Sequence, residues 1–244
     1  MMSPVIVGGN GHSGTRVFAE ILIECGIHMG LPGLSYARSS KDLNIRGLMS
    51  TWMKPYLLGL SDAQTVKMRR QFERRLRLLI PFRSRPWGFK NPRAMFLLPF
   101  YHNLFPSMKF IHVIRDGRDI CLGNPFVSSP TYWSYVSEDE MQRVTPEEAM
   151  MRFWGEANRR TKAYGESRLG SAYLRIRFED ICDNPETEIR KILTLIDAPV
   201  RRLPQLVPLV KKPSSIGRWK HHEPRLVNKI ISLGNEYLSE FGYQ

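Results

Sequence analysis

The sequence predicts a three-layer α/β/α fold, in which helices cover both faces of a central parallel β-sheet. Short apolar runs typical of buried strands alternate along the chain with segments of helical period, which is the order that builds parallel βαβ units. The first apolar run, residues 5–7, leads directly into a glycine-rich loop and then into a helix. With 244 residues, of which 42% are hydrophobic and 24% charged, the chain has the composition of a globular protein. We therefore expect one domain spanning residues 1–244.

The first half of the chain is expected to form three strands and three helices. The strands are predicted at residues 5–7, 87–90 and 109–114, and the helices at residues 14–25, 61–80 and 93–105. Ser61 is a suitable N-terminal cap for the second helix, and Pro81 would end it. Residues 27–60 mix glycine, proline and aromatic residues without a clear period, so we assign no element to them.

The second half of the chain continues the same alternation. Helices are predicted at residues 145–164, 185–196 and 224–241, a strand at residues 171–178, and loops at residues 115–119, 124–137 and 199–217. Because the carboxyl ends of parallel strands lie at one edge of a sheet, we expect the loops that follow the strands to form the functional site.

The charge balance points to an anionic partner. The chain has 36 Lys and Arg residues against 23 Asp and Glu residues, a net charge of +13, which suits nucleic acid, acidic lipid, a phosphorylated cofactor or an acidic substrate. Cys25, Cys121 and Cys182 are far apart and lack zinc-ligand spacing, so we expect reduced thiols and no metal site. With no visible signal peptide and no apolar run of about 20 residues, we expect a cytoplasmic protein.

The glycine-rich loop between the first strand and the first helix has the chemistry of an anion site. Its sequence is Gly9-Asn10-Gly11-His12-Ser13-Gly14-Thr15-Arg16. Backbone N–H groups at such a helix start form a cradle for phosphate groups. The GxxxxG spacing matches a nucleotide-binding P-loop, but Thr15 stands where the phosphate-contacting lysine would be, which disfavours ordinary ATP or GTP hydrolysis. Two alternatives stay open, namely a P-loop kinase-like phosphotransferase with a modified Walker A loop and a non-enzymatic module that binds anions or nucleic acid.

Four segments together resemble a known enzyme family. In chain order they are the glycine-rich loop, residues 110–119 (FIHVIRDGRD), residues 174–180 (LRIRFED) followed by Asn184-Pro185, and residues 216–220 (IGRWK). Their order and spacing resemble those of the sulfotransferases that use 3′-phosphoadenosine 5′-phosphosulfate (PAPS). The resemblance implies a P-loop NTPase-like sulfotransferase fold. It also implies in-line transfer of a sulfuryl group to a hydroxyl or amine of a small molecule, lipid or glycan, with adenosine 3′,5′-bisphosphate as the product.

The same resemblance implies which residues bind the nucleotide. At the 5′-phosphosulfate it places Gly11, His12, Ser13, Gly14, Thr15 and Arg16; at the 3′-phosphate it places Arg115 and the segment Gly217, Arg218, Trp219 and Lys220; beside the adenine it places Phe178. Four positions depart from the family pattern: His12 replaces an Arg or Lys, Gly123 a serine at the 3′-phosphate, Phe178 a tyrosine, and Val17 a tryptophan. We expect nucleotide binding to persist with an altered set of contacts.

Three residues are candidates for the chemistry itself. His12 and Lys90 are expected to contact the sulfuryl group, and Asp42 is the candidate base for the acceptor proton. The alternative for Lys90 is a solvated surface lysine, and the alternative for Asp42 is a turn or capping residue, with His28 as a further candidate base. His112 lies on an expected buried strand, and we interpret it as a core residue.

A dense basic run over residues 67–85 is not assigned to the nucleotide. It contains Lys67, Arg69, Arg70, Arg74, Arg75, Arg77, Arg83 and Arg85 against one acid, Glu73. The default interpretation is a solvated helix face. The alternatives are attraction of an acidic acceptor and contact with an anionic membrane.

Overall fold

The central sheet of the computed structural model contains four parallel strands in the order β2-β1-β3-β4. The strands are β1 (Val5–Gly9), β2 (Gly88–Lys90), β3 (Lys109–Ile114) and β4 (Tyr173–Arg177). The structure describes residues 3–29, 45–79, 85–123 and 145–243. The predicted parallel sheet is confirmed.

The register of the strands aligns their carboxyl ends along one edge of the sheet. Val7 of β1 pairs with Lys90, the last residue of β2, and Gly9, the last residue of β1, pairs with Val113 in β3. The last residues of β3 and β4 pair with each other. The segments that leave the four strands therefore start side by side, at the edge where the sequence predicts the functional site.

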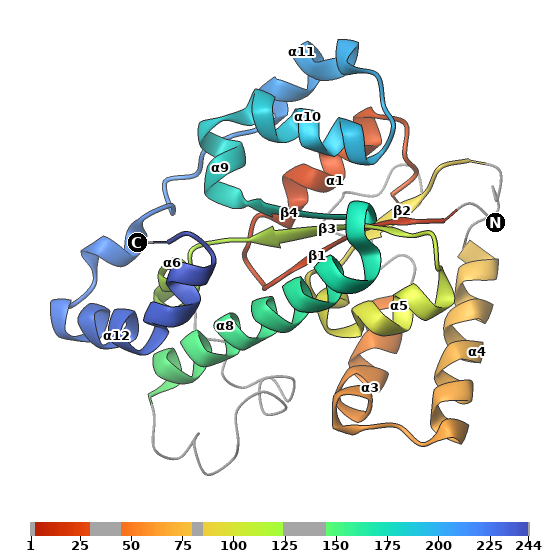
Figure 1. The fold of residues 1–244 in the computed structure, drawn as a ribbon, viewed down its shortest axis with the longest axis horizontal. Helices are drawn as coiled ribbons and strands as arrows, with labels where there is room; N and C mark the ends of the chain where they lie inside the picture. Colours follow the sequence, from red (N-terminus) through yellow and green to blue (C-terminus); the bar gives the residue numbers. More distant parts are fainter. Residues whose placement is uncertain (1–2, 30–44, 80–84, 124–144, 244) are drawn as a thin grey trace.

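Helices cover both faces of this sheet (Figure 1). One face is covered by α1 (Thr15–Glu24), α9 (Phe178–Asp183), α10 (Pro185–Leu195) and α11 (Leu203–Leu206). The other face is covered by α3 (Ile45–Leu58), α4 (Asp62–Leu79), α5 (Leu98–Leu104), α6 (Gly117–Gly123), α8 (Pro146–Tyr164) and α12 (Pro224–Glu240). The predicted three-layer α/β/α arrangement is confirmed. None of these helices, as far as they are described, has the length and apolarity that crossing a membrane requires.

Alternate residues of the strands pack into two hydrophobic cores. Val5 and Val7 of β1 belong to the core on the α1 side, whereas Ile6 belongs to the core on the α8 side. Successive strand residues point to opposite faces of a sheet, so the apolar run is buried on both sides. Phe18 of α1 and Trp154 of α8 are fully buried in these two cores.

Two helices are not predicted by the sequence pattern. The first is α3, which falls within residues 27–60 and contains Pro55, a residue that lacks the N–H used in a helix interior. The second is α6, which begins at Gly117 inside the expected polar loop at residues 115–119. The connection after β3 is therefore shorter than predicted, and it presents the start of a helix to the edge of the sheet.

Short helical turns replace several expected loops and helix ends. They are η2 (Pro92–Leu97), η4 (Gly165–Leu169), η5 (Gly170–Ala172), η6 (Val200–Arg202), η7 (Val207–Leu209) and η8 (Arg218–His221). The helix predicted at residues 93–105 is η2 followed by α5, and the loop predicted at residues 199–217 contains η6, α11 and η7. The strand predicted to reach residue 178 ends at Arg177, because Phe178 is the first residue of α9.

The start of α4 confirms Ser61 as its capping residue. Ser61 Oγ accepts a hydrogen bond from the backbone N–H of Gln64 at 3.3 Å, and Gln64 Oε1 accepts one from the backbone N–H of Ser61 at 3.0 Å. This reciprocal pair satisfies two N–H groups that the helix itself leaves unpaired.

Candidate functional site

The glycine-rich loop joins the carboxyl end of β1 to the start of α1 through a tight turn. His12 and Gly14 both have a left-handed backbone, with φ of 67° and 77°. The backbone N–H of Ser13 donates to the carbonyl oxygen of Asn10 at 3.2 Å. A Cβ atom on Gly14 would lie 2.2 Å from Cε2 of Phe178, so both the backbone conformation and the nearby ring require glycine there.

Several buried polar atoms around this loop have no hydrogen-bond partner among the described residues. They are Nδ2 and Oδ1 of Asn10, Oγ of Ser13 and Nε of Arg115. The exposed fractions of these residues are 3%, 1% and 5%, and buried polar groups in proteins are nearly always paired. Unpaired donors beside a helix N-terminus fit an anionic ligand with several acceptor oxygens, such as a phosphate or sulfate ester.

Arg115, which directly follows β3, is held by backbone groups from two distant segments. Its Nη1 donates to the carbonyl oxygen of His12 at 3.2 Å, and its Nη2 donates to the carbonyl oxygen and Oγ of Ser215 at 2.6 and 3.1 Å. The carbonyl oxygen of Arg115 accepts a hydrogen bond from Nε1 of Trp154 at 3.0 Å. Arg115 therefore links the glycine-rich loop to the C-terminal segment.

Asp119 of α6 ties the C-terminal motif at residues 216–220 to the same edge of the sheet. Its carboxylate is fully buried and accepts hydrogen bonds from the backbone N–H groups of Gly217 and Trp219 at 2.8 and 3.2 Å. Arg115 Nη2 lies 3.4 Å from the same carboxylate. Neither Asp119 nor Ser215 is among the site residues predicted from the sequence. The only signal for Asp119 in the sequence is its place at the end of the motif RDGRD, directly after Arg118.

The guanidinium group of Arg218 occupies the space beside Gly123. A Cβ atom on Gly123 would lie 1.3 Å from Nη2 and 1.8 Å from Cζ of Arg218. Nη2 and Nε of Arg218 donate to the carbonyl oxygen of Asp119 at 2.6 and 3.1 Å. Where the family pattern has a serine, glycine therefore admits a second guanidinium group near Arg115.

The remaining predicted binding residues lie around this cationic centre. The guanidinium group of Arg118 stacks 4.1 Å from the ring centroid of Trp219, and Asp116 holds Arg118 through an ion pair of 2.9 Å. Lys220 is exposed, with Nζ 5.6 Å from the same ring. On the other side of the loop, the ring centroid of Phe178 lies 5.6 Å from Cζ of Arg115.

Two groups of cations meet at the glycine-rich loop. Burial lowers the pKa of Lys90 at the end of β2, and the positive charge of Arg16 lowers it further. Partial burial also lowers the pKa of His12, and the charges of Arg218 and Arg115 act in the same direction. One pair of cations is therefore Lys90 with Arg16, and the other is Arg115 with Arg218, which lie near His12. This arrangement matches a ligand that has two separate anionic ends.

One candidate for the acceptor base lies away from this arrangement, and the other lies outside the described residues. Asp42 lies outside the residues that the structure describes. His28 forms a bridge with Trp87, just before the amino end of β2, whereas Lys90 is the last residue of that strand. The position of His28 at the opposite edge of the sheet argues against a role beside the glycine-rich loop.

His112 of β3 is a core residue, as predicted. It is fully buried, with Nδ1 2.7 Å from the hydroxyl oxygen of Tyr173 and Nε2 3.0 Å from Oδ1 of Asn158. Burial lowers the pKa of His112 to about 3. Because the unfolded chain binds this proton near pH 6.5, the stability that depends on neutral His112 is fully present above pH 6.5 and is lost as the pH falls from there towards 3.

A cavity of about 550 Å³ lies on the α8 face of the sheet, between α3, η2, α5 and α8. Its wall consists of Tyr56, Leu57, Leu60, Thr65, Met95, Phe96, Leu98, Pro99, Arg160, Thr161 and Tyr164. Because most of these side chains are apolar or aromatic, the cavity suits an apolar group rather than the anion that the glycine-rich loop suits.

The fold and the loop together define an α/β protein of the P-loop-like class, whose glycine-rich loop lies at the carboxyl edge of its sheet. The sequence profile of the sulfotransferase family matches residues 4–202, and the chain belongs to this family. No curated protein matches the chain in sequence.

Solved sulfotransferase structures have a similar fold at low sequence identity. The sulfotransferase from Alicyclobacillus acidocaldarius matches with a TM-score of 0.60 and 11% identity, over 98% of this chain and 94% of its own. The sulfotransferase domain from the curacin biosynthetic pathway matches with a TM-score of 0.55 and 13% identity, over 100% of this chain and 99% of its own. Mouse sulfotransferase SULT7A1 complexed with PAP matches with a TM-score of 0.55 and 11% identity, over 97% and 85%. The predicted sulfotransferase fold is confirmed.

Proposed function

We propose that this protein transfers a sulfuryl group from PAPS to a hydroxyl or amine of an acceptor. The observation that supports this best is the set of unpaired buried polar atoms at the glycine-rich loop, together with the two pairs of cations near it. PAPS has a phosphosulfate at its 5′ position and a phosphate at its 3′ position, so it presents two anionic ends to two cationic groups. Family membership, and the PAP bound in the mouse sulfotransferase structure, support the same ligand.

In this proposal Arg115 and Arg218 bind the 3′-phosphate. Both guanidinium groups are already fixed by hydrogen bonds, to Ser215 and to the carbonyl oxygen of Asp119, so little ordering is needed when the ligand binds. Trp219, Gly217 and Lys220 belong to the segment beside them, and the ring of Phe178 is proposed to lie against the adenine.

The other end of the nucleotide is assigned to the glycine-rich loop and to Lys90. When bound, PAPS supplies the sulfuryl group and a phosphate leaving group. The N–H groups from Gly11 onwards, Ser13 Oγ, Thr15 and Arg16 would bind the 5′-phosphate, and Lys90 would stabilise the negative charge that develops there. Because its pKa is lowered, His12 is mostly neutral at pH 7 and would donate a hydrogen bond rather than a full charge.

The acceptor and its base complete the proposal. Asp42 stays our candidate base, because it lies in the polar segment after the first helix where related enzymes place an acid near the acceptor. Small molecules, lipids and glycans with a hydroxyl or amine are the proposed acceptor classes. A kinase-like phosphotransferase is less well supported, since Thr15 is buried at the position where a P-loop lysine would reach the phosphates.

Calorimetry with adenosine 3′,5′-bisphosphate tests the nucleotide site without requiring the acceptor. We expect one site per chain and binding that is at least about tenfold tighter than binding of adenosine 5′-monophosphate, which lacks the group assigned to Arg115 and Arg218. Equal binding of the two nucleotides, or no binding at high micromolar concentration, would overturn the proposal. Magnesium-dependent turnover of ATP would instead support the kinase-like alternative.

A further inference from the structure

The α3–α4 hairpin carries almost half of the net charge of the protein. Residues 45–79 contain eight Lys and Arg residues against two acids, a net charge of +6, compared with +13 for the whole chain. The hairpin lies on the α8 side of the sheet, at the end away from the C-terminus (Figure 1). Its basic residues are not among those assigned to the nucleotide, so this charge needs a separate explanation.

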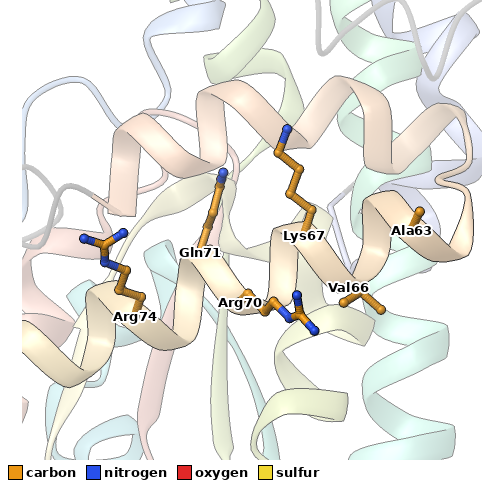
Figure 2. A pocket seen from close by; sticks show the side chains of 6 residues that line it. All are labelled: Ala63, Val66, Lys67, Arg70, Gln71 and Arg74. Carbon is orange, nitrogen blue, oxygen red and sulfur yellow. The ribbon is translucent and has the colours of Figure 1, made fainter.

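Three exposed cations start from one side of α4, and we call them the α4 stripe. Lys67, Arg70 and Arg74 are spaced by three and four residues, a spacing that places side chains on one side of a helix. All three are exposed, and none forms an ion pair with any described residue. Figure 2 shows the three side chains leaving successive turns of α4 in different directions. Together with Ala63, Val66 and Gln71 they line a hollow of about 270 Å³.

The inner side of the same helix is anchored to the protein. Met68 and Phe72 are fully buried in the core of the α8 side, and Oε1 of Gln71 accepts a hydrogen bond from Nε1 of Trp52 in α3 at 2.7 Å. The α4 stripe therefore belongs to a helix that is already packed against the rest of the protein.

Exposed apolar side chains lie at the tip of the hairpin. Leu58 at the end of α3 and Val66 in the second turn of α4 are 67% and 47% exposed, and Val200 is the third exposed large hydrophobic residue among those described. A single exposed leucine is ordinary. Two such residues on one short hairpin, beside three cations without an ion-pair partner in the described part of the chain, join positive charge to exposed apolar surface, as segments that contact lipid bilayers do.

We propose that the α3–α4 hairpin docks onto an anionic membrane surface. Lys67, Arg70 and Arg74 would face acidic headgroups, and Leu58 and Val66 would enter the boundary between headgroups and acyl chains. A nucleic acid is the weaker candidate, because the only aromatic residue of α4 is the buried Phe72, so the stripe offers no aromatic ring on which a base could stack. The proposal does not depend on the sulfotransferase activity, because the nucleotide site uses other residues.

Sedimentation with lipid vesicles tests the proposal on the full chain. We expect binding to vesicles of phosphatidylcholine with about 30% phosphatidylserine, and none to phosphatidylcholine alone, at about 0.1 M salt. The variant Lys67→Gln/Arg70→Gln/Arg74→Gln should lower the partition coefficient by at least about tenfold. The matched control Lys211→Gln/Arg190→Gln/Arg201→Gln removes the same charges from exposed positions elsewhere and should change it less than about twofold.

A second pair of measurements separates a membrane from an acidic polymer. Leu58→Ser/Val66→Ser should weaken vesicle binding severalfold while leaving binding to heparin, a polyanion without an apolar phase, unchanged. Retained binding of adenosine 3′,5′-bisphosphate or a cooperative thermal transition shows that each variant is folded. Equal loss in the two charge variants would overturn the proposal, because it would mean that net charge alone acts. Binding to heparin without binding to anionic vesicles would also overturn it, in favour of an acidic polymer.

Discussion

The cations around the glycine-rich loop and those of the α4 stripe have the same charge and different surroundings. Arg115 is 5% exposed, with hydrogen bonds to His12, Ser215 and Asp119, and Arg218 lies against the backbone at Gly123. Arg70 and Arg74 are exposed, without an ion-pair partner among the described residues. Contacts with neighbouring residues fix the positions of the Arg115 and Arg218 side chains. No such contact with a described residue fixes the charged ends of Arg70 and Arg74.

This difference separates two ways of using positive charge. A guanidinium group held in place by its neighbours binds only anions whose shape and position match it. It acts at short range in a site that excludes water. An exposed stripe attracts any nearby anionic surface, loses strength within a Debye length and weakens with added salt. Under the two proposals the net charge of +13 has two separate roles, and each role can be changed while the other stays intact.

Arg115→Ala should have the largest effect. It removes the proposed 3′-phosphate contact and leaves the carboxylate of Asp119 buried with fewer donors, so we expect affinity for adenosine 3′,5′-bisphosphate to fall about a hundredfold. The free energy of unfolding should fall by about 3 kcal/mol, because a buried pair loses one partner. Calorimetry and urea titration measure the two quantities. Arg190→Ala, at an exposed position of α10, is the control, and unchanged affinity in Arg115→Ala would contradict the assignment.

Lys90→Ala and His12→Ala should each slow sulfuryl transfer more than about tenfold, because each removes a donor at the position where charge develops. A panel of phenols, alcohols and amines is first screened with PAPS and the unmodified protein. The rates of the variants are then measured with an acceptor that gives turnover. Lys109→Ala is a matched control for Lys90, because Lys109 starts β3 at the opposite edge of the sheet. Full turnover in both site variants would show that the assigned roles are wrong.

Gly123→Ala tests whether the guanidinium group of Arg218 needs the space beside residue 123. The added methyl group would displace that group from its place over the backbone, and we expect nucleotide affinity to fall about tenfold. Arg218→Ala should produce a similar loss, and the double variant should lose no more than either single change, because both act on one interaction. Additive losses would show that Gly123 acts through something other than Arg218.

The fit between Gly123 and Arg218 shows where sequence-based prediction ends. The strands and the glycine-rich loop are visible in the sequence, because each depends on a local pattern of apolar residues and glycines. Arg115 is found through the family resemblance of the motif that contains it. The space beside Gly123 is filled by a side chain almost a hundred residues away, and no local pattern records such a contact. In the sequence, Gly123 stands out only because it replaces the serine of the family pattern and so lacks a hydroxyl group.

The same limit explains the elements that the sequence pattern does not predict. Asp119 is important because backbone N–H groups of a distant turn reach it, which only the folded chain can show. The helix α3 is missed because Pro55 and a weak period hide it, although tertiary packing of Trp52 and Met53 in the core stabilises it. Local propensity is a weak guide wherever packing decides the outcome.

The pH dependence of binding should differ between the two cationic regions. The pKa of His12 is lowered from 6.5, so His12 gains its proton only as the pH falls below that value, and its new charge then favours an anionic ligand. Nucleotide affinity of the unmodified protein should therefore rise severalfold relative to His12→Asn between pH 7.5 and 5.5. Taking the ratio of the two proteins cancels the titration of the nucleotide itself. Vesicle binding through the α4 stripe should show no dependence on His12, since lysine and arginine stay charged over this range.

The smallest effect should come from removing the α4 stripe and measuring the nucleotide site. In Lys67→Gln/Arg70→Gln/Arg74→Gln we expect affinity for adenosine 3′,5′-bisphosphate to change less than about twofold, because exposed charges at a distance are screened at physiological salt. Each change should also alter the free energy of unfolding by no more than about 0.5 kcal/mol, since the side chains are exposed and make no ion pair with described residues. A loss of nucleotide affinity that disappears at high salt would show that the stripe steers the nucleotide towards the loop. The two cationic regions would then act together on one ligand, and the separation of their roles would have to be abandoned.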